Sequence, residues 1–175
     1  MTAAGAPSSL GSMLDYLAIF RALNEAGVRY AVAGGTAVNL HGIPRMTYDI
    51  DLVLELEDKN LAAFVSLVEG WGFAPKIPVR ISDLAIEEIR QAWIRDKNMK
   101  ALNLVNERWA ISEIDVLVDP PVPIEEILAR AKKFVLSDVR VPAVDIDHLI
   151  AMKRDTGRAQ DAADIRHLER IKEEP

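Results

Sequence analysis

Cysteine is absent from this sequence of 175 residues, and histidine occurs only three times. Without cysteine there is no disulfide, no thiolate zinc site and no cysteine nucleophile. The histidines, His41, His148 and His167, lack the short spacing that would place two imidazoles on one helix face, so a zinc site is not expected. Hard oxygen ligands are what remains for metal chemistry, and we expect a protein of the reducing cytoplasm.

A long apolar run is also missing. No segment approaches the roughly 20 apolar residues that span a bilayer as a helix. The first residues, MTAAGAPSSLGS, have neither the basic region nor the apolar region of an export signal. We therefore expect a protein that neither crosses a membrane nor is exported.

Excess positive charge is the third absence. The 21 Lys and Arg residues against 27 Asp and Glu residues give a net charge of -6, which argues against general binding along DNA. The composition is otherwise that of a folded globular protein, with 50% hydrophobic and 27% charged residues. The length fits one compact domain with a short appended element.

Turn residues and apolar periodicity divide the chain into three parts. Residues 1–11 are small and polar and are predicted to form a flexible arm. Residues 12–144 alternate between helical and strand patterns and are predicted to form the core. Residues 145–175 have the apolar spacing of two helices separated by Gly157, and we expect these helices to pack on the core.

Within the core, the patterns predict a definite order of elements. Helices are predicted over residues 12–26, 36–42, 59–69 and 123–131, and strands over residues 28–35, 48–57, 100–107 and 109–119. Residues 82–96 fit either a helix or an irregular flap over an active site. Residues 134–145 are predicted to form a β-ribbon that Pro142 interrupts.

Two aspartates share one face of the strand over residues 48–57. Its apolar residues alternate with Asp49 and Asp51, and Asp115 lies on another predicted strand. If these strands are neighbours, three carboxylates concentrate negative charge that a hard cation such as Mg²⁺ neutralises. Two such ions, roughly 3.5 to 4 Å apart, would suit a phosphoryl or nucleotidyl displacement. Alternating aspartates are also the ordinary solvent-exposed face of a strand.

Gly34 and Gly35 are predicted to end a strand and open a helix. Free backbone N–H groups and the positive end of the helix dipole would then face any anion at this turn, as in many phosphate sites. Thr36 follows at the predicted helix start, where its hydroxyl has two interpretations. It either caps the helix or hydrogen-bonds a nucleotide phosphate.

These segments together resemble a known signature. AGGTAVNLHGIPRMTYDIDLVLEL, followed by EIDVL, resembles the polymerase-beta-like nucleotidyltransferase superfamily in the order and spacing of a Gly-Gly turn, a D-x-D strand and a third strand aspartate. The R-x-T-x-D-x-D pattern of residues 45–51 and the tail LIAMKRDTGRAQDAADIRHL resemble the branch related to abortive-infection toxins of toxin–antitoxin systems. The resemblance covers residues 30–56 and 111–170.

The resemblance implies an α/β nucleotidyltransferase fold, in which helices flank a mixed β-sheet. It implies that an NTP is the substrate and that two Mg²⁺ ions are held by three aspartates: Asp49, Asp51 and Asp115. Asp115 is also the candidate general base. The residues assigned to the nucleotide are Gly34, Gly35, Thr36, Arg45, Lys153, Arg158 and Asp161.

The assignments in the tail have an ordinary alternative. Acids and bases alternate almost evenly there, as in a solvated, salt-bridged helix pair, so Lys153, Arg158 and Asp161 need not belong to the site. Arg45 likewise has the alternative of a solvated loop arginine. The tail is also shorter than the C-terminal helical domain of the abortive-infection toxins, which leaves the acceptor open.

The predicted function is Mg²⁺-dependent transfer of an NMP from an NTP to a hydroxyl, with release of pyrophosphate. The expected acceptor is an RNA, such as a tRNA end, or a partner protein, and a cognate toxin or antitoxin is an expected partner. One alternative is an aminoglycoside-type small-molecule acceptor. Another is a non-catalytic nucleotide-binding protein, against which the three retained aspartates argue.

Overall fold

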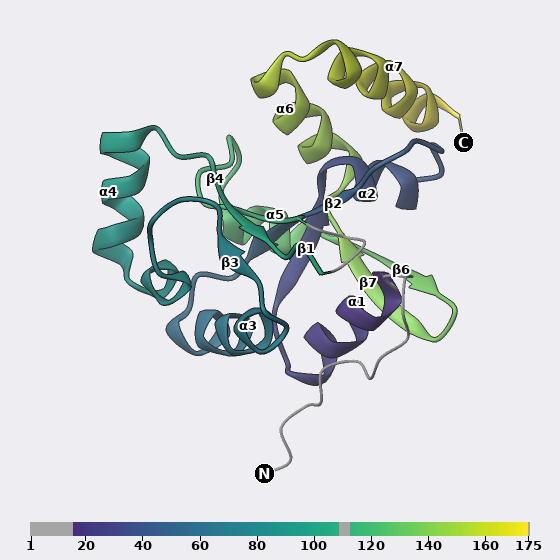
Figure 1. Ribbon diagram of the computed structural model, residues 1–175. Coiled ribbons are helices and arrows are strands. Elements are labelled where there is room, and N and C mark those ends of the chain that lie inside the picture. Colours follow the sequence, from purple (N-terminus) through teal and green to yellow (C-terminus); the bar gives the residue numbers. More distant parts are fainter. Residues whose placement is uncertain (1–15, 109–112, 175) are drawn as a thin grey trace.

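One mixed β-sheet of seven strands, in the order β3-β4-β5-β2-β1-β7-β6, organises the computed structural model (Figure 1). The structure describes residues 16–108 and 113–174, so the predicted N-terminal arm lies outside the described residues. Helices flank the sheet, and the predicted α/β class is confirmed. No helix in the described part of the chain is long and apolar enough to cross a bilayer.

The elements follow one another as α1 (Tyr16–Glu25), β1 (Tyr30–Ala33), α2 (Gly34–Leu40), β2 (Asp49–Leu54), α3 (Asp58–Gly70), β3 (Ala74–Pro75), the 3₁₀ helix η1 (Ile81–Ala85), α4 (Glu87–Lys97), β4 (Ala101–Val105), β5 (Glu113–Leu117), α5 (Ile124–Arg130), β6 (Lys132–Leu136), β7 (Val139–Ala143), α6 (Ile146–Thr156) and α7 (Ala159–Glu173).

The centre of the sheet is β2, which pairs in antiparallel fashion with β1 and in parallel with β5. Its register places Asp51 opposite Asp115. Because alternate residues of a strand point to the same face, this pairing sets the carboxylates of neighbouring strands side by side. The C-terminal helices α6 and α7 pack together beside α2, at the top of Figure 1.

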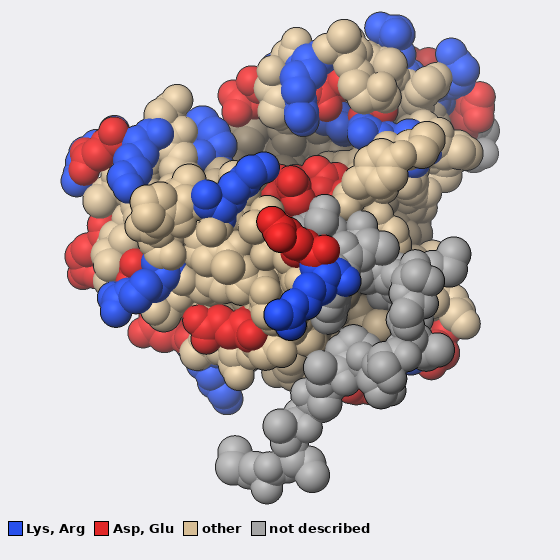
Figure 2. Space-filling model, viewed as in Figure 1, with Lys and Arg blue, Asp and Glu red and all other residues tan. Residues whose placement is uncertain are grey.

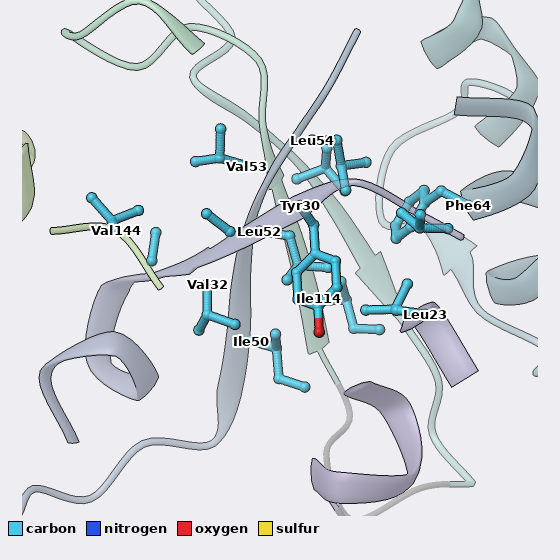
Figure 3. Packing of buried hydrophobic residues seen from close by; sticks show 14 of the residues in the cluster. Leu23, Tyr30, Val32, Ile50, Leu52, Val53, Leu54, Phe64, Ile114 and Val144 are labelled. Carbon is cyan, nitrogen blue, oxygen red and sulfur yellow. The ribbon is translucent and has the colours of Figure 1, made fainter. Parts of the chain in front are cut away.

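The opposite face of the sheet holds the main core. Ile50 and Leu52 of β2 and Ile114 of β5 are fully buried there, together with Leu23 of α1 and Phe64 of α3 (Figure 3). Full burial of each such side chain stabilises the fold by about 1.5 to 3 kcal/mol. The alternation along β2 therefore fixes its register, since a slip by one residue would bury the aspartates and expose this apolar face.

The structure decides three local predictions. The strand β1 ends at Ala33, because Gly34, with a φ of 57°, turns the chain there. Gly34 and Gly35 are therefore the first two residues of α2 and not the end of the strand. Residues 82–96 form η1 and α4, so the helical alternative is confirmed. Pro142 does not interrupt the β-ribbon: it lies within β7, opposite Lys133 of β6.

Candidate active site

Three aspartates converge on one face of the sheet. Carboxylate oxygens of Asp49, Asp51 and Asp115 all lie within 4.8 Å of one another. Asp49 and Asp51 are two residues apart on β2, and Asp115 is the partner of Asp51 on β5. The structure thus brings together the acidic triad that the sequence predicted.

Burial and mutual repulsion disfavour the ionised forms of the triad carboxylates. Burial, and then the charges of Asp49 and Asp115, raise the pKa of Asp51 to about 7. Burial also raises the pKa of Asp115, against a 2.7 Å hydrogen bond that Asn103 donates to its Oδ1. A set of carboxylate oxygens in this state fits a hard divalent cation such as Mg²⁺.

Asp49 is oriented by a residue in the loop that leads into its strand. Thr47 Oγ1 donates a 2.8 Å hydrogen bond to Asp49 Oδ1, and the backbone carbonyl of Thr47 accepts a 3.1 Å hydrogen bond from the Tyr16 hydroxyl. The threonine of the R-x-T-x-D-x-D pattern therefore connects α1 to the first aspartate. A carboxylate held from one side keeps its other oxygen for a metal ion.

The two glycines allow α2 to approach the aspartates closely. A Cβ atom on Gly34 would come within 1.8 Å of Asp51 Oδ2, and one on Gly35 within 2.8 Å of Thr47 Oγ1. Gly34 also has a positive φ, which disfavours any L side chain. Only glycine at residue 34 lets the backbone run against the D-x-D strand.

Thr36 lies inside α2 and does not cap it. The N-cap is Ala33, so the capping interpretation of Thr36 is wrong. Its side chain is buried, and its Oγ1 donates a 3.3 Å hydrogen bond to the backbone carbonyl of Asp49. Thr36 therefore links α2 to the first residue of β2.

The predicted tail residues form a buried ionic cluster. Lys153 is 6% exposed, and its Nζ lies 3.1 Å from Asp161 Oδ1 and 2.7 Å from Asp164 Oδ2. Asp161 and Asp164 are 2% and 1% exposed. The alternative of a solvated helix pair is therefore wrong for Lys153 and Asp161. Asp164 was missed by the sequence analysis, although it lies three residues after Asp161 and so on the same face of α7.

Two arginines join this cluster from different sides. Arg45, in the loop before β2, donates a hydrogen bond to Asp164 Oδ2, and its side chain is only 22% exposed, so it is not a solvated loop residue. Arg158 Nε donates a 2.9 Å hydrogen bond to Asp161 Oδ2, but its side chain is 74% exposed. Arg45 is thus used to hold the fold, whereas Arg158 reaches solvent.

Asp161 is ionised despite its surroundings. Burial acts to raise its pKa, but hydrogen bonds from Thr156, Arg158 and Lys153 outweigh burial and lower the pKa of Asp161 to about 2. The charges of Lys153 and Arg158 also act on Asp51, where they oppose the rise in pKa. The buried ionic cluster therefore lies beside the triad. Figure 2 shows acidic side chains in a hollow below α6 and α7, with basic side chains around its rim.

The sequence matches a known protein family over most of its length. The profile of the family described as "Nucleotidyl transferase AbiEii toxin, Type IV TA system" matches residues 17–175. A comparison with curated protein sequences finds no match.

Solved structures with a similar fold include two antibiotic-modifying enzymes. The lincosamide antibiotic adenylyltransferase LnuA, lincomycin-bound, has a TM-score of 0.60 at 15% identity, with 88% of this chain and 94% of that chain covered. ANT(2'')-Ia in complex with adenylyl-2''-tobramycin has a TM-score of 0.52 at 14% identity, with 88% of each chain covered. At these identities the similarity establishes the fold alone.

Proposed function

The chain belongs to the AbiEii nucleotidyltransferase toxin family and is a nucleotidyltransferase, and we propose that it moves an NMP from an NTP to a hydroxyl of an RNA or a protein, using Mg²⁺. The observation that carries this proposal is the convergence of Asp49, Asp51 and Asp115 within 4.8 Å beside the glycine-opened helix α2. The family's place in toxin–antitoxin systems supports a cytoplasmic toxin with a cognate antitoxin as partner.

The three aspartates share one task in this proposal, and Asp115 has a second. Asp49, Asp51 and Asp115 would hold two Mg²⁺ ions, which neutralise charge on the triphosphate and polarise the reacting oxygens. Asp115, the partner of Asp51 on β5, is also proposed to act as general base and accept the proton of the acceptor hydroxyl. The acceptor oxygen then forms a bond to the α-phosphorus, and the bond to pyrophosphate breaks.

The nucleotide is proposed to lie between α2 and the C-terminal helices. Gly34, Gly35 and Thr36 form the start of α2 beside Asp51, where backbone N–H groups can approach a triphosphate. Arg158, 74% exposed beside Asp51, is the cation best placed to reach the phosphates. Lys153 and Asp161 would complete the nucleotide site on the side of the C-terminal helices, where Asp161 holds the side chains of Lys153 and Arg158 in place.

A small-molecule acceptor is the second candidate. The similarity covers 94% of the lincomycin-bound lincosamide adenylyltransferase LnuA, so a chain of this size contains the elements of a small-molecule transferase. ANT(2'')-Ia has likewise been solved in complex with adenylyl-2''-tobramycin. A non-catalytic role is disfavoured because the triad is complete.

The test is to incubate the protein with each radiolabelled NTP and Mg²⁺, and to offer total RNA, lysate protein and a panel of amino sugars separately. Label in RNA or protein, lost in Asp51→Asn, would support the proposal. Label in amino sugars alone would support the second candidate. No pyrophosphate release with any acceptor would contradict both.

A further inference from the structure

Lys76 lies near the triad, on the side away from the C-terminal helices. Lys76 follows β3 directly, and its backbone N–H donates a 2.9 Å hydrogen bond to the carbonyl of Asn103 on β4. Its Nζ lies 3.5 Å from Glu113 Oε1. Glu113 precedes Asp115 by two residues on β5, so both side chains point to one face of the sheet. The ammonium group of Lys76 is therefore held on the triad face.

The cations around the triad are divided between two sides. Lys153 and Arg158 of the C-terminal helices act on Asp51, whereas Lys76 acts on Asp115. The sheet order gives the reason: β3 and β4 lie beyond β5, and β1 with α2 lies beyond β2. The triphosphate is proposed to use the side of α2. The side of β3 is then left for the acceptor, next to the proposed general base.

Lys76 is also free to exchange its partner. Its side chain is 60% exposed, and among the described residues its ion pair is with Glu113, whose side chain is 39% exposed. Such an exposed pair is weak in water. Lys153, in contrast, is enclosed between two buried carboxylates. An incoming anion can therefore displace Glu113 from Lys76 far more easily than it can displace Asp161 or Asp164 from Lys153.

We propose that Lys76 binds a phosphate that the acceptor carries beside its reacting hydroxyl, as the terminal nucleotide of an RNA does. This inference rests on the proposed function and narrows its acceptor. A lysine is a point charge that binds phosphate without strict geometry. The ammonium groups of an amino sugar would be repelled by Lys76, and a serine or tyrosine hydroxyl of a protein carries no phosphate beside it.

The test compares Lys76→Ala and Lys76→Glu with Lys133→Ala, which removes an exposed lysine from β6 at the other edge of the sheet. Fluorescence anisotropy measures binding of a labelled single-stranded RNA with a free 3′ hydroxyl, at several salt concentrations and without turnover. We expect Lys76→Ala to weaken binding roughly tenfold and to reduce the salt slope by about 0.7, as for one lost phosphate contact on a single strand. Lys133→Ala should bind like the parent.

Kinetics then separate the acceptor from the nucleotide. In Lys76→Ala the KM for RNA should rise while the KM for NTP stays near the parent value. AMP is offered as a second acceptor. If the parent labels AMP, and Lys76→Ala lowers transfer to AMP as much as transfer to RNA, the phosphate contact is supported and a free nucleotide is the acceptor. RNA binding and RNA KM unchanged in Lys76→Ala would overturn the inference, as would labelling of amino sugars or protein alone. If Lys76→Ala loses RNA binding but the parent transfers no NMP to RNA, the proposed function is contradicted, whereas the contact between Lys76 and an RNA phosphate is supported.

Discussion

Lys153 and Asp164, on two different helices, form a buried ion pair with 2.7 Å between Nζ and Oδ2. Arg45 donates to the same carboxylate from the loop before β2. One side chain of α7 therefore connects α6 to the loop that leads into the strand carrying Asp49 and Asp51. We therefore expect this carboxylate to help hold the C-terminal helices beside the triad.

Asp164→Ala is expected to destabilise the protein by about 3 kcal/mol or more, because Lys153 is left in a buried site with less compensating charge. The free energy of unfolding in urea measures this. Asp138→Ala is the matched control, since it removes an aspartate that is 74% exposed and paired with Arg21. That variant should lose at most about 1 kcal/mol. Equal losses in the two variants would mean that the buried cluster does not hold the helices.

Arg158→Ala is expected to change kinetics more than stability. Its side chain is 74% exposed, and Asp161 keeps hydrogen bonds from Lys153 and Thr156. A lost charge-assisted phosphate contact of about 1.5 to 3 kcal/mol should raise the KM for NTP, or lower kcat, roughly tenfold or more. Arg154→Ala on α6 removes another exposed arginine, 65% exposed and paired with Glu169, and should keep parent kinetics. Parent-like kinetics in both variants would remove Arg158 from the nucleotide site.

Gly34→Ala separates backbone strain from a steric clash. Gly34 and Gly27 both have a positive φ, but a Cβ on Gly27 would meet nothing within 4 Å, whereas one on Gly34 would strike Asp51 Oδ2. Gly27→Ala should therefore cost about 1 to 2 kcal/mol of stability and keep transfer activity. Gly34→Ala should lose activity as well, because Asp51 must move. Full activity in a folded Gly34→Ala variant would show that close approach is not needed.

The D-x-D strand could be predicted because its information is local. The alternation along residues 48–57 places Asp49 and Asp51 on one face, and the family resemblance supplies Asp115. The buried cluster could not be predicted in this way. Asp164 and Arg45 are 119 residues apart, and the charge pattern of α7 looks like that of any solvated helix. Lys76 has no local signal at all, since its place at the triad comes from the pairing of β3, β4 and β5.

Acid should weaken the fold through Asp161. The pKa of Asp161 in the folded protein, lowered by its hydrogen bonds to about 2, lies below the ordinary value of 3.8. Its contribution is therefore complete above pH 4 and is lost as the pH falls towards 2. The size is on the order of 2 kcal/mol. The free energy of unfolding in urea, measured at pH 6, 4 and 3, should fall less over this range in Asp161→Asn than in the parent. Parallel losses would assign the acid sensitivity to other groups.

Asp51→Asn should make the metal-free protein more stable while it abolishes transfer. Burial, with the charges of Asp49 and Asp115, raises the pKa of Asp51 from 3.8 to about 7, so the parent loses stability as the pH rises through this interval. At pH 8 the variant should therefore have a higher Tm than the parent in EDTA, and this advantage should shrink towards pH 5, where the parent carboxyl is protonated. Mg²⁺ should raise the Tm of the parent at pH 8 and have much less effect on the variant, because the ion relieves a repulsion that the amide has already removed. A parent Tm that does not respond to Mg²⁺, together with an Asp51→Asn variant that is less stable than the parent at pH 8, would show that the three carboxylates are balanced by the protein alone and do not form a metal site.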